Sequence, residues 1–493
     1  MLDVLSVENM RESDAATIAN GTPGTELMMR AARGVFNAVS FKPPVAIVCG
    51  SGNNAGDGYA LALLLEEAGI EHTVFCVYDR FSPDGKYYYE KLSKGTVLFD
   101  NSSDAFAGFA TIVDCLLGTG FRGEVRSELR AVIEAINESG AYVVSVDINS
   151  GLNGDTGMAG VCVRSDLTVS VGSFKPGHFL NMAKDVMKEK VNVDIGIEPA
   201  GEPYKLIEGS DIAGMLGMRP NYSNKGTYGY TALIGGSDRY SGAIRLAYLA
   251  NAAMRSGAGV VKVALPSSTV HDVAQHVLES TIFPLSCEDS QVAYVPEEIG
   301  ELTANVKTVA FGMGIGTGEG AAKILEHLLR GYEGTLIVDA DGLTLLSRMD
   351  PKTVADRKCA LVMTPHIKEF SRLAGKEIPK ILEDPIGEAK AYAKECGAVV
   401  LLKGPSTIVT DGKRVYMTDR GCAGMATAGS GDVLSGIMAA ICAYVGDKTL
   451  AAAAAAYING AAGELAEEKH GAISMIASDT VAEIGNAIRT VTQ

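Results

Sequence analysis

The chain has 493 residues, a formal net charge of −16, 47% hydrophobic residues and 21% charged residues. This length exceeds one ordinary hydrophobic core, so two domains are expected, and the composition is that of a globular protein. The acidic balance argues against a surface that binds nucleic acid or anionic membranes, because both need clustered Lys and Arg. Small molecules are therefore the expected partners.

The nine cysteines are scattered singly, without a C-x-x-C pair. This pattern indicates neither a zinc site nor a disulfide framework and favours a reducing cytosol. The acidic residues close to Met1 do not fit a signal peptide, and no apolar run reaches the roughly 18 residues of a membrane span. A soluble cytoplasmic protein is expected.

Short β-branched runs alternate with Ala- and Leu-rich stretches from Val45 to about Val193, as in parallel strands joined by helices. Gly, Pro and Ser interrupt this alternation over 196–226, which predicts a domain boundary near residue 208. The first domain is therefore expected at 1–207. Its strands are expected at 44–50, 72–79, 110–118, 141–148 and 167–173.

The alternation resumes in the second domain, which is expected at 208–493 as a larger α/β unit. The last 60 residues have a helical pattern, and the run "AAAAAAY" from Ala451 is expected to form one buried helix face. Strands are expected at 229–236, 259–266, 306–314, 334–341, 360–365 and 398–404.

The stretch "GMATAGSGDVLSG" (424–436) places Asp432 among glycines at the start of an apolar helix. The free N–H groups of such a helix favour a phosphate. A carboxylate would repel that phosphate, unless it takes the proton from a hydroxyl that attacks the phosphorus. A helix cap explains Asp432 equally well.

Further polar side chains follow the expected strands of the second domain, where ligands of open α/β sheets bind. His366 alone is better explained by a structural role, but the set forms a polar ring around one crevice. Its members are Asp339, Asp341, Thr364, His366, Glu369, Lys403 and Thr407.

Residues 224–261, with "GMGIG", "VDADGL", "TPHIKEF", "LKGPSTIV" and "MATAGSGDVLSG", closely resemble the ribokinase-like NAD(P)H-hydrate dehydratases over essentially all of 208–493. The resemblance implies dehydration of the S epimer of hydrated NADH or NADPH with Asp432 as the base. It implies ADP, or in some relatives ATP, as co-substrate, with Mg²⁺, and release of AMP and phosphate. Met313 stands where the family usually has proline.

The same resemblance places the hydrate at Ala243, Gly316, His366 and Asp432. It places the nucleotide at Lys403, Gly404, Pro405, Ser406, Thr407 and Gly431.

In the first domain, "VCGSGNNAGDGYALALLL" follows a strand and opens a helix, but its glycine spacing is one residue longer than the dinucleotide fingerprint. Asn53, Asn54 and Asp57 supply polar groups where a plain phosphate loop offers only backbone, although a tight structural turn is the alternative. Asp147 and Lys175 lie at neighbouring strand ends. They could transfer a proton to and from carbon, or the lysine could neutralise a carboxylate without catalysis.

These loops, preceded by "MRESDAATIANGTPGTELMMRAA", resemble the NAD(P)H-hydrate epimerase domain over residues 1 to about 207. The resemblance implies a Rossmann-like three-layer domain that interconverts the R and S hydrates, with Asp147 and Lys175 as acid/base candidates. It places potassium at Asn54, Asp114 and Ser150. It places the hydrate at Asn53, Asn54, Ala55, Gly56, Asp57, Gly118, Thr119, Gly120, Phe121, Arg122, Gly123, Glu124 and Asp147.

Three residues depart from the epimerase pattern: Met29 replaces a common acid, Ala55 replaces a glycine, and Asn149 sits where proline is frequent. None removes a proposed acid or base. Ala55 is expected to narrow the approach of the backbone to the substrate.

The sequence thus predicts a cytoplasmic α/β enzyme, forming a homo-oligomer, that repairs hydrated nicotinamide cofactors. The alternative is a ribokinase-like small-molecule kinase fused to a nucleotide-binding sensor domain, which would make a stable phosphorylated product. A third possibility is a catalytically silent first domain that recruits a partner. The residues do not decide between ADP and ATP or between the two hydrated cofactors.

Overall fold

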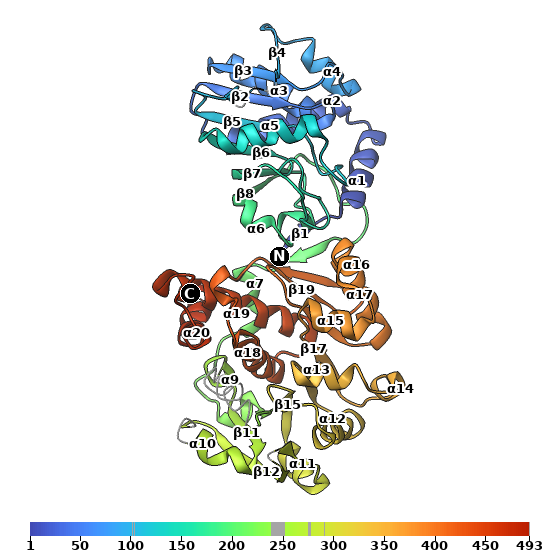
Figure 1. Ribbon diagram of the computed structural model, residues 1–493, viewed down its shortest axis with the longest axis vertical. Helices are drawn as coiled ribbons and strands as arrows, with labels where there is room; N and C mark the ends of the chain where they lie inside the picture. Colours follow the sequence, from blue (N-terminus) through green and yellow to red (C-terminus); the bar gives the residue numbers. More distant parts are fainter. Residues whose placement is uncertain (101, 103, 238–251, 275–277, 290, 493) are drawn as a thin grey trace. The chain divides into compact units, whose positions relative to one another are not determined.

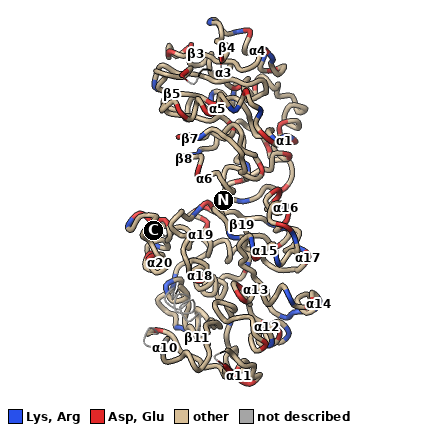
Figure 2. The backbone as a smooth tube through the Cα atoms, in the orientation of Figure 1, with Lys and Arg blue, Asp and Glu red and all other residues tan. Residues whose placement is uncertain are grey.

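The structure is a computed structural model that describes residues 1–100, 102, 104–237, 252–274, 278–289 and 291–492. The chain divides into two compact units, one of residues 3–204 and one of residues 1–2 with 205–493 (Figure 1). Acidic and basic residues are interspersed along both units (Figure 2). Among the helices of the described residues, none is long and apolar enough to cross a membrane.

The first unit contains a seven-stranded sheet in the order β4-β3-β2-β5-β6-β7-β8, and all its neighbouring strands are parallel. The strand order reverses between β2 and β5, which is where open α/β sheets bind ligands. The strands are β2 (Val45–Cys49), β3 (His72–Cys76), β4 (Val97–Leu98), β5 (Thr111–Cys115), β6 (Tyr142–Val146), β7 (Ser165–Val171) and β8 (Met187–Val193).

A tight turn joins β2 to α3 at this reversal. A Cβ on Gly50 would lie 2.1 Å from the carbonyl oxygen of Leu116, so glycine is required for the loops after β2 and β5 to approach each other. Helix α3 begins after Gly52 without a side-chain cap, which leaves its first amides available. The unit's helices are α1 (Val7–Ala19), α2 (Gly24–Ala38), α3 (Asn53–Glu67), α4 (Pro83–Tyr89), α5 (Ser127–Glu138) and α6 (Ala183–Val186).

The second unit contains an eleven-stranded sheet in the order β1-β9-β20-β19-β18-β17-β16-β15-β10-β11-β12. The strands from β18 to β12 pair in parallel, whereas β18, β19 and β20 pair antiparallel. The order reverses between β10 and β15. The strands are β1 (Leu2–Val4), β9 (Tyr204–Leu206), β10 (Tyr230–Ile234), β11 (Val260–Pro266), β12 (Thr281–Leu285), β15 (Val306–Phe311), β16 (Thr335–Val338), β17 (Ala360–Met363), β18 (Val399–Leu402), β19 (Thr407–Thr410) and β20 (Val415–Thr418), with a separate hairpin of β13 (Cys287–Glu288) and β14 (Gln291–Val292).

Helices cover both faces of this sheet, with α18, α19 and α20 on one side and α12 to α17 on the other (Figure 1). The longer helices are α7 (Gly209–Leu216), α11 (Pro296–Thr303), α12 (Glu319–Gly331), α15 (Ile367–Ala374), α17 (Pro385–Cys396), α18 (Ser430–Tyr444), α19 (Lys448–His470) and α20 (Ala477–Thr492). The shorter ones are α9 (Ala252–Arg255), α10 (Val270–Ala274), α13 (Asp341–Leu346), α14 (Pro351–Ala355) and α16 (Ile378–Glu383).

The alanine run in α19 is buried more completely than its sequence predicts. All six residues from Ala451 to Ala456 are at most 5% exposed, so every side of this helix segment is covered rather than one face. The helix contacts α18 and α20 as well as β19 and β20. Alanine fits here because small side chains allow helices and sheet to approach closely.

Candidate active sites

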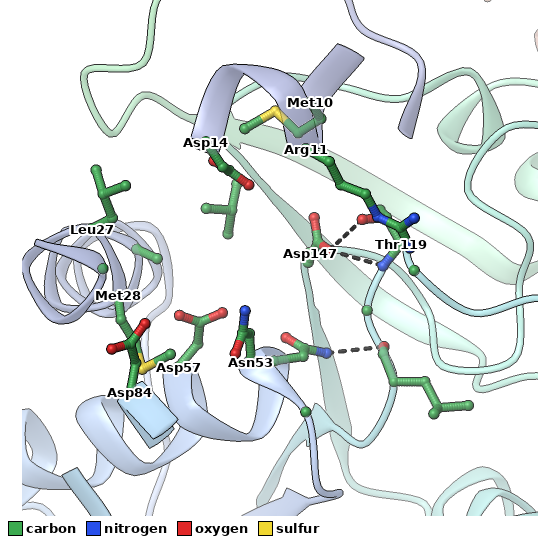
Figure 3. A pocket seen from close by; sticks show the side chains of 18 of the residues that line it. Met10, Arg11, Asp14, Leu27, Met28, Asn53, Asp57, Asp84, Thr119 and Asp147 are labelled. Carbon is green, nitrogen blue, oxygen red and sulfur yellow. Dashed lines mark hydrogen bonds between the residues drawn. The ribbon is translucent and has the colours of Figure 1, made fainter. Parts of the chain in front are cut away.

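A cavity of about 520 Å³ lies at the carboxyl ends of the strands where the order of the first sheet reverses (Figure 3). The turn after β2 contributes Asn53, Asn54 and Asp57, and the loop after β5 contributes residues 116–121. The ends of β6 and β7 contribute Asp147 and Lys175. The structure therefore brings together loops that the sequence placed at separate strand ends.

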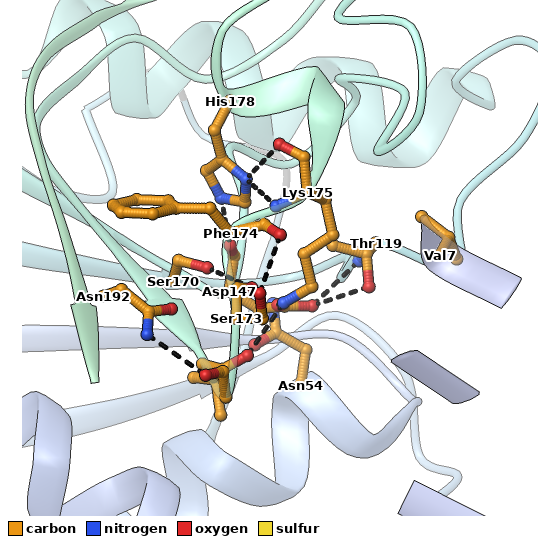
Figure 4. Close-up of polar contacts among 12 residues, drawn as sticks. Val7, Asn54, Thr119, Asp147, Ser170, Ser173, Phe174, Lys175, His178 and Asn192 are labelled. Carbon is orange, nitrogen blue, oxygen red and sulfur yellow. Dashed lines mark hydrogen bonds and ion pairs between the residues drawn. The ribbon is translucent and has the colours of Figure 1, made fainter. Parts of the chain in front are cut away.

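Asp147 and Lys175 form the central ion pair of this cavity (Figure 4). Lys175 is 1% exposed, and its Nζ donates to Asp147 Oδ1 at 2.7 Å and to the Val171 carbonyl at 2.8 Å. The other carboxylate oxygen of Asp147 accepts from both the amide and the hydroxyl of Thr119, each at 3.0 Å. Although burial opposes ionisation, these donors and the lysine charge hold the pKa of Asp147 below its usual range.

The backbone at Asp147 is held in an unusual conformation. Its φ of 65° is rare for a residue with a side chain. His178 donates through Nε2 to the Asp147 carbonyl at 2.7 Å, while its Nδ1 accepts from the Lys175 amide at 3.0 Å. Burial lowers the pKa of His178 to about 4, so this histidine is neutral and serves to position both members of the pair.

Next to this pair, Asp114 lies at the end of β5 without any exposed surface. Its carboxylate accepts from the Ser150 amide at 2.9 Å and from the Ser150 hydroxyl at 2.5 Å, with further bonds from Ser145 and the Leu116 amide. No Lys or Arg of the described residues pairs with Asp114, and burial raises its pKa. The Oδ1 atom of Asn54 is buried and has no partner among the described residues.

Two further carboxyl groups face the cavity from other elements. Asp14 of α1 has its pKa raised to about 6, mainly by burial, with Asp147 adding to the effect and Lys175 opposing it. Burial also raises the pKa of Asp57 of α3 well above its usual value. Asp14, Met10, Arg11 and Ile18 of α1 line the cavity although the sequence analysis did not select them.

Several residues selected from the sequence lie outside the cavity lining. Ala55 of α3 is buried in the hydrophobic core of the first unit, and Gly56 is buried beside Met28. Arg122 pairs with Asp155 at 2.6 Å. Gly123 and Glu124 follow in the same loop without lining the cavity.

The departures at Met29 and Asn149 have structural explanations. Met29 packs against the hydrophobic core of the first unit. Asn149 is fully buried and donates to the carbonyls of Val163 at 2.9 Å and Val186 at 3.0 Å, while its Oδ1 accepts from Thr168 at 2.6 Å. The amide thus ties the segment after β6 to β7, which a proline could not do.

In the second unit, the polar strand ends gather around Lys403, which follows β18. Its Nζ lies 2.9 Å from Asp339 Oδ1 after β16 and 4.0 Å from Glu369 Oε2 of α15. Ser435 of α18 donates to the other oxygen of Asp339 at 2.7 Å. Burial opposes the charge of Lys403, but Asp339 and Glu369 raise its pKa, so the ammonium persists.

Asp432 lies in the first turn of α18, beside this cluster. The helix has no side-chain cap, and the carboxylate of Asp432 accepts no hydrogen bond from the described residues, so the capping explanation is not supported. Burial, with the negative charge of Asp339, raises the pKa of Asp432 to about 7, while Lys403 opposes that rise. A Cβ on Gly431 would lie 3.4 Å from Lys403 Nζ, which places the start of α18 against the lysine.

The remaining selected residues of this unit occupy adjacent loops. His366 caps α15, because its Nδ1 accepts from the Lys368 amide at 3.1 Å, and its side chain is 47% exposed. Gly316 donates its amide to Asp341 at 2.9 Å. The turn 403–407 joins β18 to β19, with Gly404 and Pro405 exposed, Ser406 buried and Thr407 half-buried.

Two selected positions need separate mention. Ala243 lies outside the described residues. Met313 is fully buried, and its carbonyl accepts from the Gly236 amide at 2.8 Å, so this residue joins the loops after β15 and β10 without proline.

Comparisons with known proteins match the two units separately. A family model described as NAD(P)H-hydrate dehydratase matches residues 231–486, and one described as YjeF-related protein N-terminus matches residues 24–177. A solved structure of the ADP/ATP-dependent NAD(P)H-hydrate dehydratase from Bacillus subtilis, co-crystallised with ATP and Mg²⁺, is 25% identical with a TM-score of 0.52. It covers 58% of this chain and 99% of its own.

Full-length relatives carry both parts. A bifunctional NAD(P)H-hydrate repair enzyme of Thermofilum pendens is 34% identical, covering 89% of this chain and 86% of its own. One from Hyperthermus butylicus is 35% identical, covering 95% of this chain and 89% of its own. These matches do not favour the alternative of a small-molecule kinase. The chain belongs to the family of bifunctional NAD(P)H-hydrate repair enzymes.

Proposed function

We propose that the chain restores NADH and NADPH from their hydrates, by epimerisation in the first unit and nucleotide-dependent dehydration of the S hydrate in the second. The observation that carries the dehydration is the arrangement around Asp432. This carboxylate has no hydrogen-bond donor among the described residues, lies at an uncapped helix start and is close to the Lys403 ammonium. A base is thus placed beside groups that bind phosphate.

The chemistry of dehydration follows from this placement. Asp432 takes the proton of the substrate hydroxyl as its oxygen attacks the terminal phosphorus of ADP, and AMP leaves. The phosphorylated oxygen then departs as phosphate while the neighbouring ring carbon loses a proton to water, which restores the double bond. Lys403 and the amides at Gly431 would bind the phosphates, and Asp339 keeps Lys403 in place through its 2.9 Å contact.

ADP is the co-substrate that the motifs imply, and ATP is the alternative. The Bacillus subtilis dehydratase that crystallised with ATP and Mg²⁺ supports a nucleotide with Mg²⁺ in the matching unit here. Mg²⁺ would neutralise phosphate charge when bound. The hydrate is assigned to Gly316, His366 and Asp432, and also to Ala243.

In the first unit, Asp147 and Lys175 are proposed to transfer protons during epimerisation. Their ion pair at 2.7 Å and their place in the cavity support this role. The hydrate is assigned to the loops at 53–57 and 118–124. Among these residues, Asn53, Asn54, Asp57 and 118–121 line the cavity.

Potassium is assigned to Asn54, Asp114 and Ser150, and the residues present fit this ion. The unpartnered Asn54 Oδ1 and the Asp114 carboxylate, which has no Lys or Arg partner among the described residues, offer the hard oxygen ligands that such a cation prefers. A bound cation would offset the buried negative charge and order the loops after β5 and β6. The homo-oligomeric state and the cytoplasmic location stay predictions.

The test is to supply purified R and S hydrates separately with ADP or ATP. The return of reduced-nicotinamide absorbance and the release of phosphate are followed together. Stoichiometric recovery of both signals from the S hydrate, and from the R hydrate only after epimerisation, is the expected result. A stable phosphorylated product without recovered NAD(P)H would instead support the kinase alternative.

A further inference from the structure

Epimerisation of the hydrate needs proton transfer on both faces of the ring. Water adds to the enamine double bond of a dihydronicotinamide so that the hydroxyl lies on the carbon bonded to the ring nitrogen. When this C–O bond breaks, the nitrogen lone pair forms a C=N bond and the oxygen leaves as water with a proton from an acid. Water then adds to the opposite face, and a second group accepts its proton, so atoms and charges balance.

One wall of the cavity already has a group suited to accept a proton. Asp147 is held ionised by Lys175 and Thr119, which donate to its two oxygens. A single ionised carboxylate on one face does not supply the donor that the other face requires.

The opposite side of the cavity carries Asp14 and Asp57 (Figure 3). Asp14 belongs to a face of α1 that is formed by Met10, Asp14 and Ile18 at spacings of four residues, and all three line the cavity. Its carboxyl group makes no hydrogen bond with the described residues, so it is available to a ligand.

Helix α1 is fixed firmly enough to position that carboxyl group. Its first amide, of Val7, donates to Asp155 at 2.8 Å. Ser13 is buried and accepts from the Ala200 amide at 2.8 Å. Met10 packs against Gly172 just after β7, where a Cβ would meet its terminal methyl at 2.5 Å. Asp14 is thus anchored from both sides of the helix.

We propose that Asp14 is a second catalytic proton-transfer residue of the epimerase, acting on the ring face opposite to Asp147. This role rests on the proposed function of the first unit. In one direction Asp14 gives its proton to the departing hydroxyl while Asp147 accepts a proton from the entering water, and in the reverse direction the two exchange roles.

The electrostatic surroundings separate the two carboxyl groups. Asp14 is faced by Arg11 on its own helix and by the groups of four other elements, and its pKa of about 6 lies near neutral pH, where an acid can both give and regain a proton. The facing groups of the other elements are Asp57, Asp84, Asp147 and Lys175. Burial raises the pKa of Asp57 well above its usual value.

The test compares full-length Asp14→Asn and Asp14→Glu with wild type, starting from pure R hydrate and following its conversion to S hydrate by NMR without nucleotide. Glu12→Gln is the matched control, because Glu12 lies on the same helix but is exposed and does not line the cavity. Dehydration of the S hydrate, the activity proposed for the second unit, is measured in parallel.

The Asn variant is expected to lose about a hundredfold or more in the kcat of epimerisation, as removal of a general acid does. Wild-type kcat should fall as pH rises above about 6, because Asp14 then loses its proton. The Glu variant should have a lower kcat with the same fall at alkaline pH. The kcat of the Asn variant should show no such fall. Glu12→Gln should match wild type. S-hydrate dehydration should be unchanged in all variants.

Epimerisation by Asp14→Asn within about threefold of wild type would overturn the proposal, and so would an alkaline limb that persists in this variant. Thermal melting checks its folding. If Asp14→Asn unfolds at a lower temperature than wild type, the Asp14→Glu variant gives the answer. If kcat of that variant no longer falls at alkaline pH, Asp14 has only a packing role. A wild-type chain that fails to convert R hydrate above the uncatalysed background would refute the epimerase function itself, which is a distinct outcome.

Discussion

Replacing Asp432 by Asn tests the dehydratase mechanism with the least structural change. The amide has the same shape, and the carboxylate accepts no hydrogen bond from the described residues, so α18 loses no cap. The lost step is proton abstraction from the substrate hydroxyl. Such a loss costs about 10²–10⁴-fold in turnover, or about 3–5 kcal/mol of transition-state stabilisation.

The pKa of Asp432 also predicts how strongly the rate of dehydration depends on pH. A base must be ionised, and with a pKa of about 7 its ionised fraction rises about tenfold between pH 6 and pH 8. Wild-type dehydration of the S hydrate at low substrate should rise by that factor, whereas the Asn variant should show no such rise.

The assay follows recovery of reduced-nicotinamide absorbance from pure S hydrate with saturating ADP. Asp350→Asn is the matched control, because Asp350 caps α14 by accepting from the Lys352 amide and lies at a helix start outside the proposed site. Near-normal turnover by Asp432→Asn would refute the role of this residue as the base. Equal losses in both variants would mean that charge at helix starts, and not proton abstraction, controls the rate.

Three further variants test the other assignments. Asp147→Asn should block use of the R hydrate but leave S-hydrate dehydration intact, in an assay that is short relative to spontaneous epimerisation. If this variant consumes R hydrate above that background at the rate of the wild-type protein, the assignment is wrong. Asn54→Ala should weaken activation of epimerisation by potassium, measured against KCl at constant ionic strength, and an unchanged KCl dependence would count against the site. Asn149→Ala should lower the free energy of unfolding by at least about 3 kcal/mol, because several buried partners lose their hydrogen bonds, and urea denaturation measures this loss.

The strands that carry the sites were predictable because their residues are apolar and buried on both faces. β2 and β5 are buried over their whole length; β2 is a continuous apolar run, and in β5 the apolar pair Ile112 and Val113 precedes Asp114. β8 was not expected, because "MKEKVNV" is an edge strand whose residues are mostly exposed. The hairpin of β19 and β20 was also not expected, although Asp411-Gly412 between two β-branched runs is a usable turn signal and Gly412 has a φ of 86°.

Some residues of the candidate sites could likewise be predicted from the sequence, whereas others could not. Asp147, Lys175 and Lys403 follow strands, and parallel strands bring their carboxyl ends to one edge, so spacing alone indicated that they face ligands. Asp14 and Arg11 lie on a helix that precedes the sheet, and no sequence spacing relates that helix to a particular strand end. Their place in the cavity comes from the packing of α1 at Gly172, which only the fold reveals.

Both candidate sites contain a lysine close to carboxylates, but the pKa of Asp147 is lowered whereas that of Asp432 is raised. In the first unit Lys175 donates directly to the carboxylate of Asp147, the proposed proton-transfer residue, and this contact holds the pKa of Asp147 below its usual range. In the second unit Lys403 pairs with Asp339 instead, and that negative charge helps raise the pKa of Asp432 to about 7.

Dehydration should therefore fail first as pH drops, while an epimerase that uses the protonated acid of Asp14 remains active. At pH 6 both hydrates should consequently equilibrate faster than they are cleared, and a time course from pure R hydrate should show S hydrate accumulating before NAD(P)H appears. Accumulation at pH 8 but not at pH 6 would contradict this assignment of charges.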